Sequence, residues 1–266
     1  MKRTIIPGLL LCLALIPFAG AWAGDTLARI NKTETLRVGM TGSQPPFTFR
    51  SKDGNLMGMD VDLARLLASA MGVRLEIVAI PFTGLLDALE AGEVDIVLSG
   101  VTATLQRNLR VAFVGPYYVS GKSLLTKSST LANIQASDEI NQKALSVATL
   151  RGSTGETFVK QVAPKARLEA VLNYDDGIEL LLKDEVDMFL ADAPIIQLTA
   201  LRYTDAGLVQ LKQPLTVEPI GIALPPDDPL LLNLVENYLD AVTATGGLDA
   251  LHKKWFENGA WLVNLP

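Results

Sequence analysis

Residues 95–107 read Asp95-Ile-Val-Leu-Ser-Gly-Val-Thr-Ala-Thr-Leu-Gln-Arg107. The apolar run at residues 96–98 is typical of a short strand that is buried on both faces of a sheet. Thr104 has the residue type of a helix N-cap, which puts Arg107 in the first turn of a helix. Because the helix dipole already makes that end positive, a guanidinium there favours the binding of an anion. We therefore predict that this stretch forms half of a carboxylate site.

Strands and helices alternate along the chain around this stretch. The expected strands are 36–40, 73–80, 94–98, 145–149, 166–172 and 186–190, and the expected helices are 60–71, 83–91, 153–162 and 175–182. The segment 41–58 is expected to be a loop. The second half repeats the order of the first, and Glu93-Val94-Asp95 is echoed by Glu185-Val186-Asp187. This order predicts an α/β fold of two similar lobes with parallel strands and helical crossovers.

The chain is expected to cross between the two lobes twice. The extended stretch 113–126 leads into lobe two, and a strand at 219–224 leads back. Helices at 229–242 and 247–258 are too few for a third domain, so they complete lobe one. Two crossings make a two-stranded hinge. The predicted divisions are 1–23 as a leader, 24–118 with 220–266 as lobe one, and 119–219 as lobe two.

The first 23 residues have the features of a secretory signal peptide. A basic start at Lys2 and Arg3 precedes an apolar run, and Ala21-Trp22-Ala23 supplies the cleavage site before Gly24. The alternative, a membrane anchor, is disfavoured because the apolar run is too short to span a bilayer. The only cysteine, Cys12, lies in this segment, so the exported protein is expected to have no disulfide.

Composition excludes several classes of function. Removal of the leader takes the formal net charge from −6 to −8, which disfavours binding to nucleic acid. Clusters of cysteine and histidine are absent from the sequence, and the single His252 lies in a predicted surface helix. We therefore expect no metal, no cofactor and no catalytic histidine.

Ligands of open α/β sheets bind beyond the carboxyl ends of the parallel strands. In lobe one, that rule selects Ser99, Gly100, Thr102 and Arg107. In lobe two, it selects the loops 151–154 and 191–194, the second of which follows the last parallel strand. The latter residues of interest are Ser153, Thr154 and Asp192.

The two lobe-two features each have two interpretations. Ser153 and Thr154 begin a helix whose free N–H groups suit an anion, although Ser153 three residues before Glu156 also has the spacing of a simple capping box. Asp192 follows an apolar strand and needs a cation or hydrogen-bond donors, which a ligand ammonium would supply. The alternative is an aspartate that stabilises a turn.

Two aromatic residues follow prolines in the selected loops. Phe47 comes after Pro45-Pro46, and Phe82 comes after Pro81. Because prolines hold a loop rigid, we predict that both rings form walls of the ligand pocket. The alternative is that these rings belong to the core.

The sequence resembles the periplasmic solute-binding proteins for polar amino acids, which are the extracellular family 3 components of ABC importers. The resemblance extends over nearly the whole exported chain. It rests on Leu36-Arg-Val-Gly, Pro46-Phe47, Gly54 through Gly58-Met-Asp-Val-Asp62-Leu-Ala, Gly92-Glu-Val-Asp95, Ser99-Gly-Val-Thr-Ala-Thr104 with Arg107, Pro116-Tyr117-Tyr118, Gly152-Ser-Thr154, and Asp187 with Asp192.

The resemblance implies a type II periplasmic-binding-protein fold that closes on an α-amino acid and docks on an inner-membrane permease. It implies that Ser99, Gly100, Thr102, Arg107 and Thr154 hold the ligand's carboxylate and part of its ammonium, that Asp192 takes the ammonium, and that Phe47 and Phe82 are the aromatic walls. The implied protein is a periplasmic monomer without enzymatic activity. Gln44 stands where relatives for cationic amino acids often carry an aromatic residue, which puts such a ligand in doubt.

Two other functions remain open at this point. Periplasmic cyclohexadienyl or arogenate dehydratases resemble the same family, but they are expected to carry a glutamate just after the lobe-two aspartate, where this chain has Pro194-Ile195. A sensor domain of a membrane kinase or receptor channel would need a transmembrane helix after the second lobe, and the sequence ends at Pro266 without one.

Overall fold

The computed structural model describes residues 24–127 and 137–266, so the expected leader lies outside the described residues. The elements of lobe one are α1 Asp25–Thr33, β1 Thr35–Met40, β2 Ser43–Gln44, β3 Thr48–Arg50, β4 Leu56–Met57, α2 Met59–Met71, β5 Arg74–Ala79, α3 Leu85–Glu90, β6 Ile96–Val97, α4 Leu105–Asn108, β7 Ala112–Ser120, β13 Glu218–Leu224, α8 Pro229–Ala244 and α9 Gly247–His252. Those of lobe two are β8 Lys122–Thr126, β9 Ser146–Leu150, α5 Thr154–Val162, β10 Arg167–Val171, α6 Tyr174–Leu182, β11 Met188–Asp192, α7 Ala193–Arg202 and β12 Val209–Gln210.

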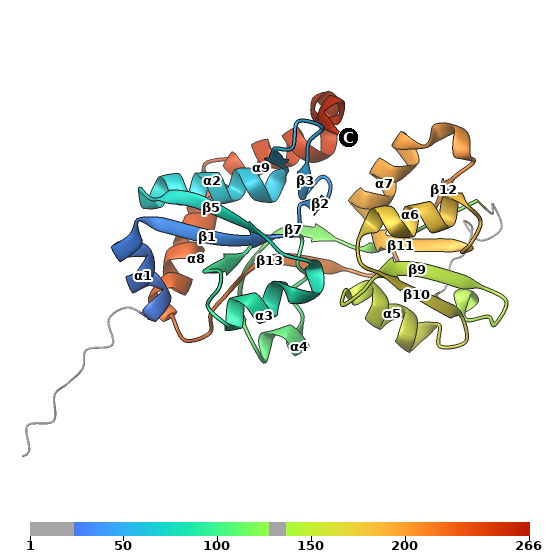
Figure 1. Cartoon of the computed structure of the whole chain (residues 1–266), viewed down its shortest axis with the longest axis horizontal. Coiled ribbons are helices and arrows are strands. Elements are labelled where there is room, and N and C mark those ends of the chain that lie inside the picture. Colours follow the sequence, from blue (N-terminus) through green and yellow to red (C-terminus); the bar gives the residue numbers. More distant parts are fainter. Residues whose placement is uncertain (1–23, 128–136) are drawn as a thin grey trace, which may run out of the picture.

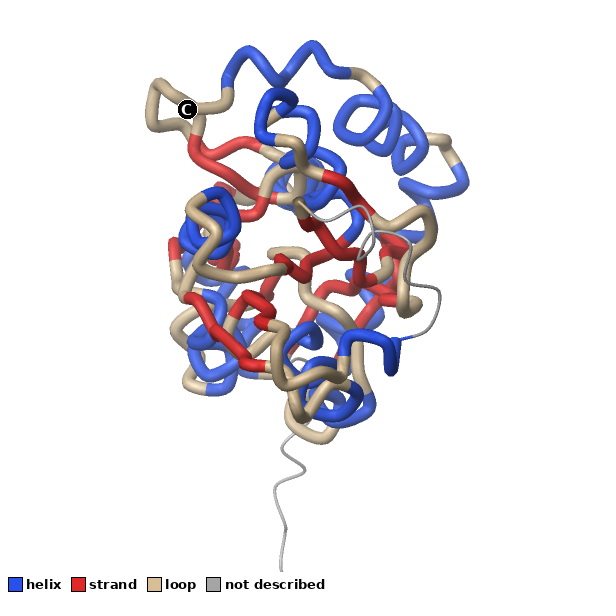
Figure 2. Tube along the Cα trace, turned by 90° about the vertical axis from the view of Figure 1, so that its right-hand side faces the viewer, coloured by secondary structure: helices blue, strands red, loops and turns tan. Residues whose placement is uncertain are grey.

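The two lobes lie side by side, each built on one five-stranded sheet with helices packed around it (Figures 1 and 2). The strand orders are β5-β1-β6-β13-β7 in lobe one and β10-β9-β11-β8-β12 in lobe two. In each sheet, the first three strands are parallel, the fourth runs antiparallel to them, and the fifth is antiparallel to the fourth and so runs in the direction of the first three. The prediction of two similar α/β lobes is confirmed. No helix in the described ranges is long and apolar enough to cross a membrane.

The sequence echo between the lobes has a structural cause. Asp95 precedes β6 and accepts the backbone N–H of Arg37 in β1 at 2.6 Å. Asp187 precedes β11 and accepts the backbone N–H of Ser146 in β9 at 2.8 Å. Each aspartate thus ties β6 or β11 to the middle one of the three parallel strands, which is β1 in lobe one and β9 in lobe two. Asp95 is fully buried and is also paired with the guanidinium groups of Arg29 and Arg37, which satisfies its charge.

Two antiparallel strands connect the lobes, as predicted. β7 and β13 pair with each other along the segment that runs from lobe one toward lobe two, where Pro219 lies opposite Val119 and Glu218 lies opposite Ser120. After Gly121, the chain enters β8 of the lobe-two sheet. The domain boundaries predicted at 118/119 and 219/220 fall on this paired segment.

Three local predictions differ from the structure. The segment 41–58 contains the small antiparallel sheet β2-β3-β4 rather than a loop. The last predicted helix is α-helical only to His252 and continues as a π-helical turn over residues 253–257. Helix α1 was not predicted, because its main support is distant in sequence. The carboxylate of Asp228 accepts the backbone N–H groups of Gly24 at 3.2 Å and Leu27 at 2.8 Å.

A hydrophobic contact links the lobes on the side away from α5. Leu198 of α7 is only 6% exposed and belongs to the same core cluster as Trp255 and Trp261 of lobe one. The C-terminal segment that follows α9 lies beside α7 in Figure 1. This contact joins residues of different lobes, so it exists only while the lobes are together.

The change Leu198→Ala is expected to weaken ligand binding by about 30-fold, since burial of a leucine side chain contributes about 2 kcal/mol to the form in which the lobes touch. Isothermal titration calorimetry measures the affinity. Leu201→Ala is the matched control, because Leu201 lies on the same helix and is 68% exposed. Equal affinities for the two variants would mean that the contact does not contribute to closure.

Candidate functional site

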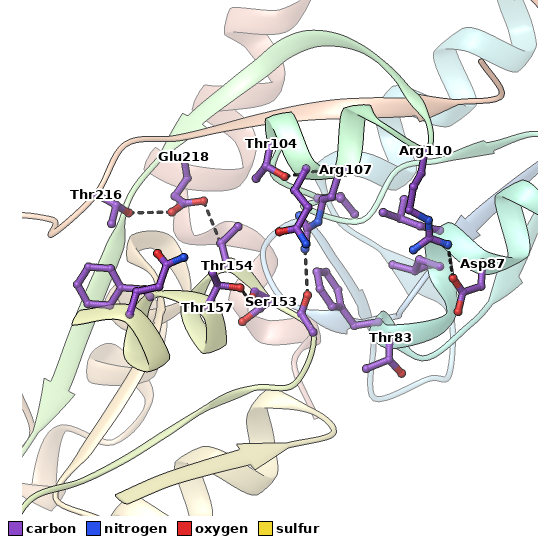
Figure 3. A pocket seen from close by; sticks show the side chains of 18 residues that line it. Thr83, Asp87, Thr104, Arg107, Arg110, Ser153, Thr154, Thr157, Thr216 and Glu218 are labelled. Carbon is purple, nitrogen blue, oxygen red and sulfur yellow. Dashed lines mark hydrogen bonds and ion pairs between the residues drawn. The ribbon is translucent and has the colours of Figure 1, made fainter. Parts of the chain in front are cut away.

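A cavity of about 590 Å³ lies between the two lobes, with walls from α3 and α4 of lobe one and from α5 of lobe two (Figure 3). Small-molecule sites have volumes of this order. Four of the nine predicted site residues line it, namely Phe82, Arg107, Ser153 and Thr154. The other five are buried around it and do not line it, namely Phe47, Ser99, Gly100, Thr102 and Asp192.

Arg107 points into this cavity from the short helix α4 (Figure 3). Thr104 caps the helix by accepting the backbone N–H of Arg107 at 3.1 Å, as predicted. The guanidinium donates to the carbonyl of Thr102 at 2.8 Å and, across the lobes, to the carbonyl of Gly152 at 3.1 Å. It also lies over the Phe82 ring, 5.7 Å from its centroid.

The charge of Arg107 is balanced only at a distance. Within the described residues it forms no ion pair, and both of its side-chain hydrogen bonds go to neutral carbonyls. Burial lowers the pKa of this guanidinium from its ordinary value, and the charges of Glu218 and Asp192 oppose that shift. A half-buried cation without a direct ionic partner is suited to an anionic ligand group.

The start of α5 faces Arg107 from lobe two. Ser153 accepts the backbone N–H of Glu156 at 3.2 Å and donates to the carbonyl of Leu150 at 2.6 Å, so its hydroxyl serves as a helix cap. The structure therefore supports the interpretation of Ser153 as a helix cap. Thr154, the next residue, turns its hydroxyl toward the cavity and donates to Glu218 at 2.9 Å. The first amides of α5 have no partner within their own helix.

The Ser99–Thr102 loop is held by groups of its own lobe. Ser99 accepts the backbone N–H of Thr41 at 3.0 Å and donates to the side-chain oxygen of Gln44 at 2.9 Å. Gly100 donates its N–H to Asp60 at 2.8 Å and has a φ of +58°, in the left-handed region that favours glycine. The structure thus commits the hydroxyl of Ser99 and the amide of Gly100 to positioning the loop that carries Arg107.

Phe47 packs among core aromatic rings and does not line the cavity, so its role as a pocket wall stays a prediction. It is 1% exposed and contacts the rings of Tyr118 and Phe256 edge to face, each with centroids 5.4 Å apart. A Cβ on Gly100 would lie 3.4 Å from the Phe47 ring, so the ring packs directly against the loop at Gly100. The cis peptide Pro45-Pro46 precedes a ring that turns inward.

Gln44 meets lobe two through Tyr174, a residue that the sequence analysis did not select. Tyr174 begins α6 and is 4% exposed. Burial raises the pKa of its hydroxyl well above the ordinary range, Asp192 raises it further, and a hydrogen bond with Gln44 opposes the shift. Gln44, which stands where relatives for cationic amino acids often carry an aromatic residue, therefore forms a polar contact between the lobes.

Asp192 already has a cation within the chain. Its two carboxylate oxygens each lie 3.0 Å from the Nζ of Lys122, and both side chains are at most 5% exposed. The pairing follows from the antiparallel register of β8 and β11, in which Lys122 is opposite Asp192. The expectation that Asp192 requires a ligand ammonium did not include this lysine. The sequence feature that could have indicated this partner is the single charged residue, Lys122, at the start of the strand 122–126.

Glu218 is a third residue that the sequence analysis did not select, after Tyr174 and Lys122. It begins β13, is 6% exposed and lines the cavity. One carboxylate oxygen accepts the hydroxyl of Thr154, and the other accepts the hydroxyl of Thr216 at 2.9 Å (Figure 3). The sequence feature that could have indicated Glu218 is its position as an acidic residue just before the expected apolar strand 219–224.

The cavity therefore joins one unpaired guanidinium, one carboxylate and the start of a helix. It has no group of three or more metal-ligating side chains among the described residues. The other charged residues that line it, Arg110 and Asp87, form a surface ion pair at 2.6 Å.

Comparisons with known proteins identify the family and the fold of this chain. The model of the bacterial extracellular solute-binding proteins, family 3, matches residues 36–258. Cyclohexadienyl dehydratase of Pseudomonas aeruginosa is 29% identical over 252 residues, which cover 93% of this chain and 92% of that protein. A binding component of an ABC transporter from Wolinella succinogenes, complexed with lysine, has a TM-score of 0.82 and 35% identity over 86% of this chain and 98% of its own. The structure of an ancestral amino-acid-binding protein, a precursor of cyclohexadienyl dehydratase, has a TM-score of 0.80 and 35% identity over 87% of this chain and 100% of its own.

Proposed function

Because the chain belongs to the bacterial extracellular solute-binding proteins, family 3, we propose that it captures an α-amino acid between its lobes and delivers it to an ABC permease in the inner membrane. The leader predicted at residues 1–23 supports export to the periplasm. The lobes close on the ligand about the β7–β13 connection. The protein acts as a monomer in this scheme.

The observation that carries the proposal is Arg107, which points into the cavity between the lobes and has no ionic partner among the described residues. A ligand carboxylate can accept two parallel hydrogen bonds from the guanidinium. The first amides of α5 offer further donors from the other lobe, while the hydroxyl of Thr154 is engaged in its hydrogen bond to Glu218. A carboxylate bound there would be held by both lobes at once, which couples binding to closure. Phe82 supplies an apolar wall beside Arg107.

Asp192 remains the predicted partner of the ligand ammonium. That role requires Lys122 to share or release at least one carboxylate oxygen, because both oxygens now lie at hydrogen-bond distance from the lysine. Ser99, Gly100 and Thr102 contribute through the shape of their loop.

The proposal is tested by calorimetric titration of the exported protein with the proteinogenic L-amino acids and L-cystine. At least one of them is expected to bind with a Kd below about 100 μM. If none binds below about 1 mM, the proposal fails. The mass of the protein from a periplasmic extract should correspond to a chain that starts at Gly24.

A lyase on the same scaffold is the second candidate, favoured by the dehydratase of Pseudomonas aeruginosa among the relatives. Such chemistry needs a general acid in the cleft. The start of α7 after Asp192 carries Ala193-Pro194-Ile195, which has no titratable side chain. An assay with prephenate and arogenate is expected to yield no enzymatic product, and turnover of either compound would replace the binding proposal by the enzymatic one.

A further inference from the structure

The connection between the two sheets is one residue long on the outward path of the chain. β7 ends at Ser120 in lobe one and β8 begins at Lys122 in lobe two, so only Gly121 lies between them. The returning chain passes this point closely, because a Cβ on Gly121 would overlap the backbone oxygen of Thr216. A change in the angle between the lobes therefore concentrates on the few residues at this crossing, which is the pivot of the molecule.

On the return path, Thr216 and Glu218 lie on opposite sides of the pivot. Thr216 is tied to lobe two, since its hydroxyl oxygen accepts the backbone N–H of Lys122 at 2.9 Å. Glu218 is the first residue of β13 and pairs with Ser120 in the lobe-one sheet. Val217, which is 78% exposed, is the single residue between them. Glu218 is thus the lobe-one residue next to the pivot on this path.

The carboxylate of Glu218 reaches back across the pivot to lobe two. One oxygen accepts the hydroxyl of Thr216 and the other accepts the hydroxyl of Thr154, the first residue of α5, each at 2.9 Å (Figure 3). Glu218 is almost fully buried and forms no ion pair with any residue in the described part of the chain. Two donors of lobe two therefore satisfy a buried charge of lobe one, and hydrogen bonds to an ionised acceptor are the strong ones.

We infer that Glu218 is a positioning residue for closure, whose carboxylate braces the pivot in the closed form and releases Thr154 when the lobes open. This inference rests on the proposed function and goes beyond it, because it assigns the residue that sets how readily the lobes close. α5 moves with lobe two, so rotation about Gly121 and Val217 carries Thr154 away from Glu218. The open form then lacks the hydrogen bond between Thr154 and Glu218.

The Glu218 brace acts on the closed population and not on the ligand. A ligand that binds only the closed form has an apparent affinity that is reduced by the fraction of the protein that is closed. Loss of the brace therefore lowers the affinity for every ligand by the same factor. A residue that contacts the ligand, in contrast, changes the affinities of different ligands by different factors.

Distances between the lobes test the brace without any ligand. The single cysteine of the sequence, Cys12, lies in the expected leader, so cysteines introduced at two exposed positions can carry spin labels. Leu109→Cys in lobe one and Leu172→Cys in lobe two are suitable, because these leucines are 87% and 60% exposed. Pulsed electron paramagnetic resonance then measures the ratio of closed to open distances. Glu218→Ala is expected to lower this ratio at least about tenfold, because it removes hydrogen bonds to a charged group.

A double-mutant cycle separates the brace from a direct contact with the ligand. Thr154→Val removes the hydroxyl donor and should weaken binding of the tightest amino acid of the panel at least about fivefold. The same change should cost less than about twofold in Glu218→Ala, where the acceptor is already absent. Thr157→Val is the matched control and should also cost less than about twofold, since Thr157 lines the same cavity but donates its hydroxyl to the carbonyl of Ser153 within α5. Calorimetric titration measures all four affinities.

An unchanged distribution of distances in Glu218→Ala would overturn the inference. An equal loss from Thr154→Val in both backgrounds would also overturn it, because Thr154 would then be a ligand contact. If thermal melting finds Glu218→Ala unfolded, Glu218→Gln replaces it, and loss of the charge alone should lower the closed-to-open ratio at least about threefold. If the wild type binds no amino acid, the proposed function fails, while the distance measurement still decides whether Glu218 braces the pivot.

Discussion

Replacing Arg107 with alanine is expected to weaken the binding of any α-amino acid by at least about 100-fold. The ligand carboxylate would lose its bidentate partner, and truncation of one member of such a charge pair costs about 2–5 kcal/mol. The variant would also lose the hydrogen bond from Arg107 to the carbonyl of Gly152, which joins the two lobes. Calorimetric titration with the tightest amino acid of the panel measures the effect.

Arg110→Ala is the control for this experiment. Arg110 lines the same cavity three residues further along, but its guanidinium is paired with Asp87 and Glu90 at the surface. We expect its replacement to change the affinity by less than about threefold, as exposed ion pairs contribute little. Arg107→Lys should recover part of the affinity, because lysine keeps the charge and loses the planar fork. Undiminished binding by Arg107→Ala would refute the site.

The second large effect concerns stability and the carboxyl group of Asp60. This residue begins α2, is fully buried, and accepts the N–H of Gly100 at 2.8 Å. Burial raises its pKa from 3.8 to about 7, while Tyr117 and the Gly100 amide oppose the shift. Its other oxygen and the Tyr117 hydroxyl are buried without a well-formed hydrogen bond within the described ranges. The carboxyl therefore favours its neutral form in the folded protein.

The sign of the pH dependence follows from this shift. Between about pH 4 and pH 7, the unfolded chain releases the Asp60 proton while the folded protein keeps it, so folding stability falls as pH rises through this window. The shift of about three pKa units corresponds to about 4 kcal/mol, which is lost in full above the folded pKa. This contribution is present below about pH 4.

Asp60→Asn is therefore expected to exceed the wild type in unfolding free energy by a few kcal/mol at pH 8 and by little at pH 4.5. Urea denaturation at pH 4.5, 6 and 8 measures the difference. Asp62→Asn on the same helix is the control and should have the opposite sign at pH 8, because the Asp62 carboxylate accepts hydrogen bonds from Lys254 at 2.6 Å and Trp255 at 2.9 Å. A pH-independent difference for Asp60→Asn would contradict the prediction.

Much of the lobe-one half of the site could be read locally. Thr104 and Arg107 are three residues apart, so the cap and the guanidinium lie in one turn, and their relation follows from helix geometry alone. The interpretation of Ser153 as a cap was available for the same reason. Phe47 could not be placed this way, since proline holds a backbone but does not decide to which side the next ring turns.

The alternation of elements and its repetition were determined by the sequence itself, because hydrophobic periodicity and strand-end residues act over a few positions. The echo of Asp95 and Asp187 is a further example, because each carboxylate accepts a backbone N–H from the middle one of the three parallel strands of its own lobe. The ionic partners in the cleft were decided only by the tertiary structure. Lys122 meets Asp192 through the register of two strands 70 residues apart, and Glu218 reaches Thr154 only where the returning strand passes the second lobe. Charge pairs between distant segments depend on how the lobes assemble, and no local pattern encodes that arrangement.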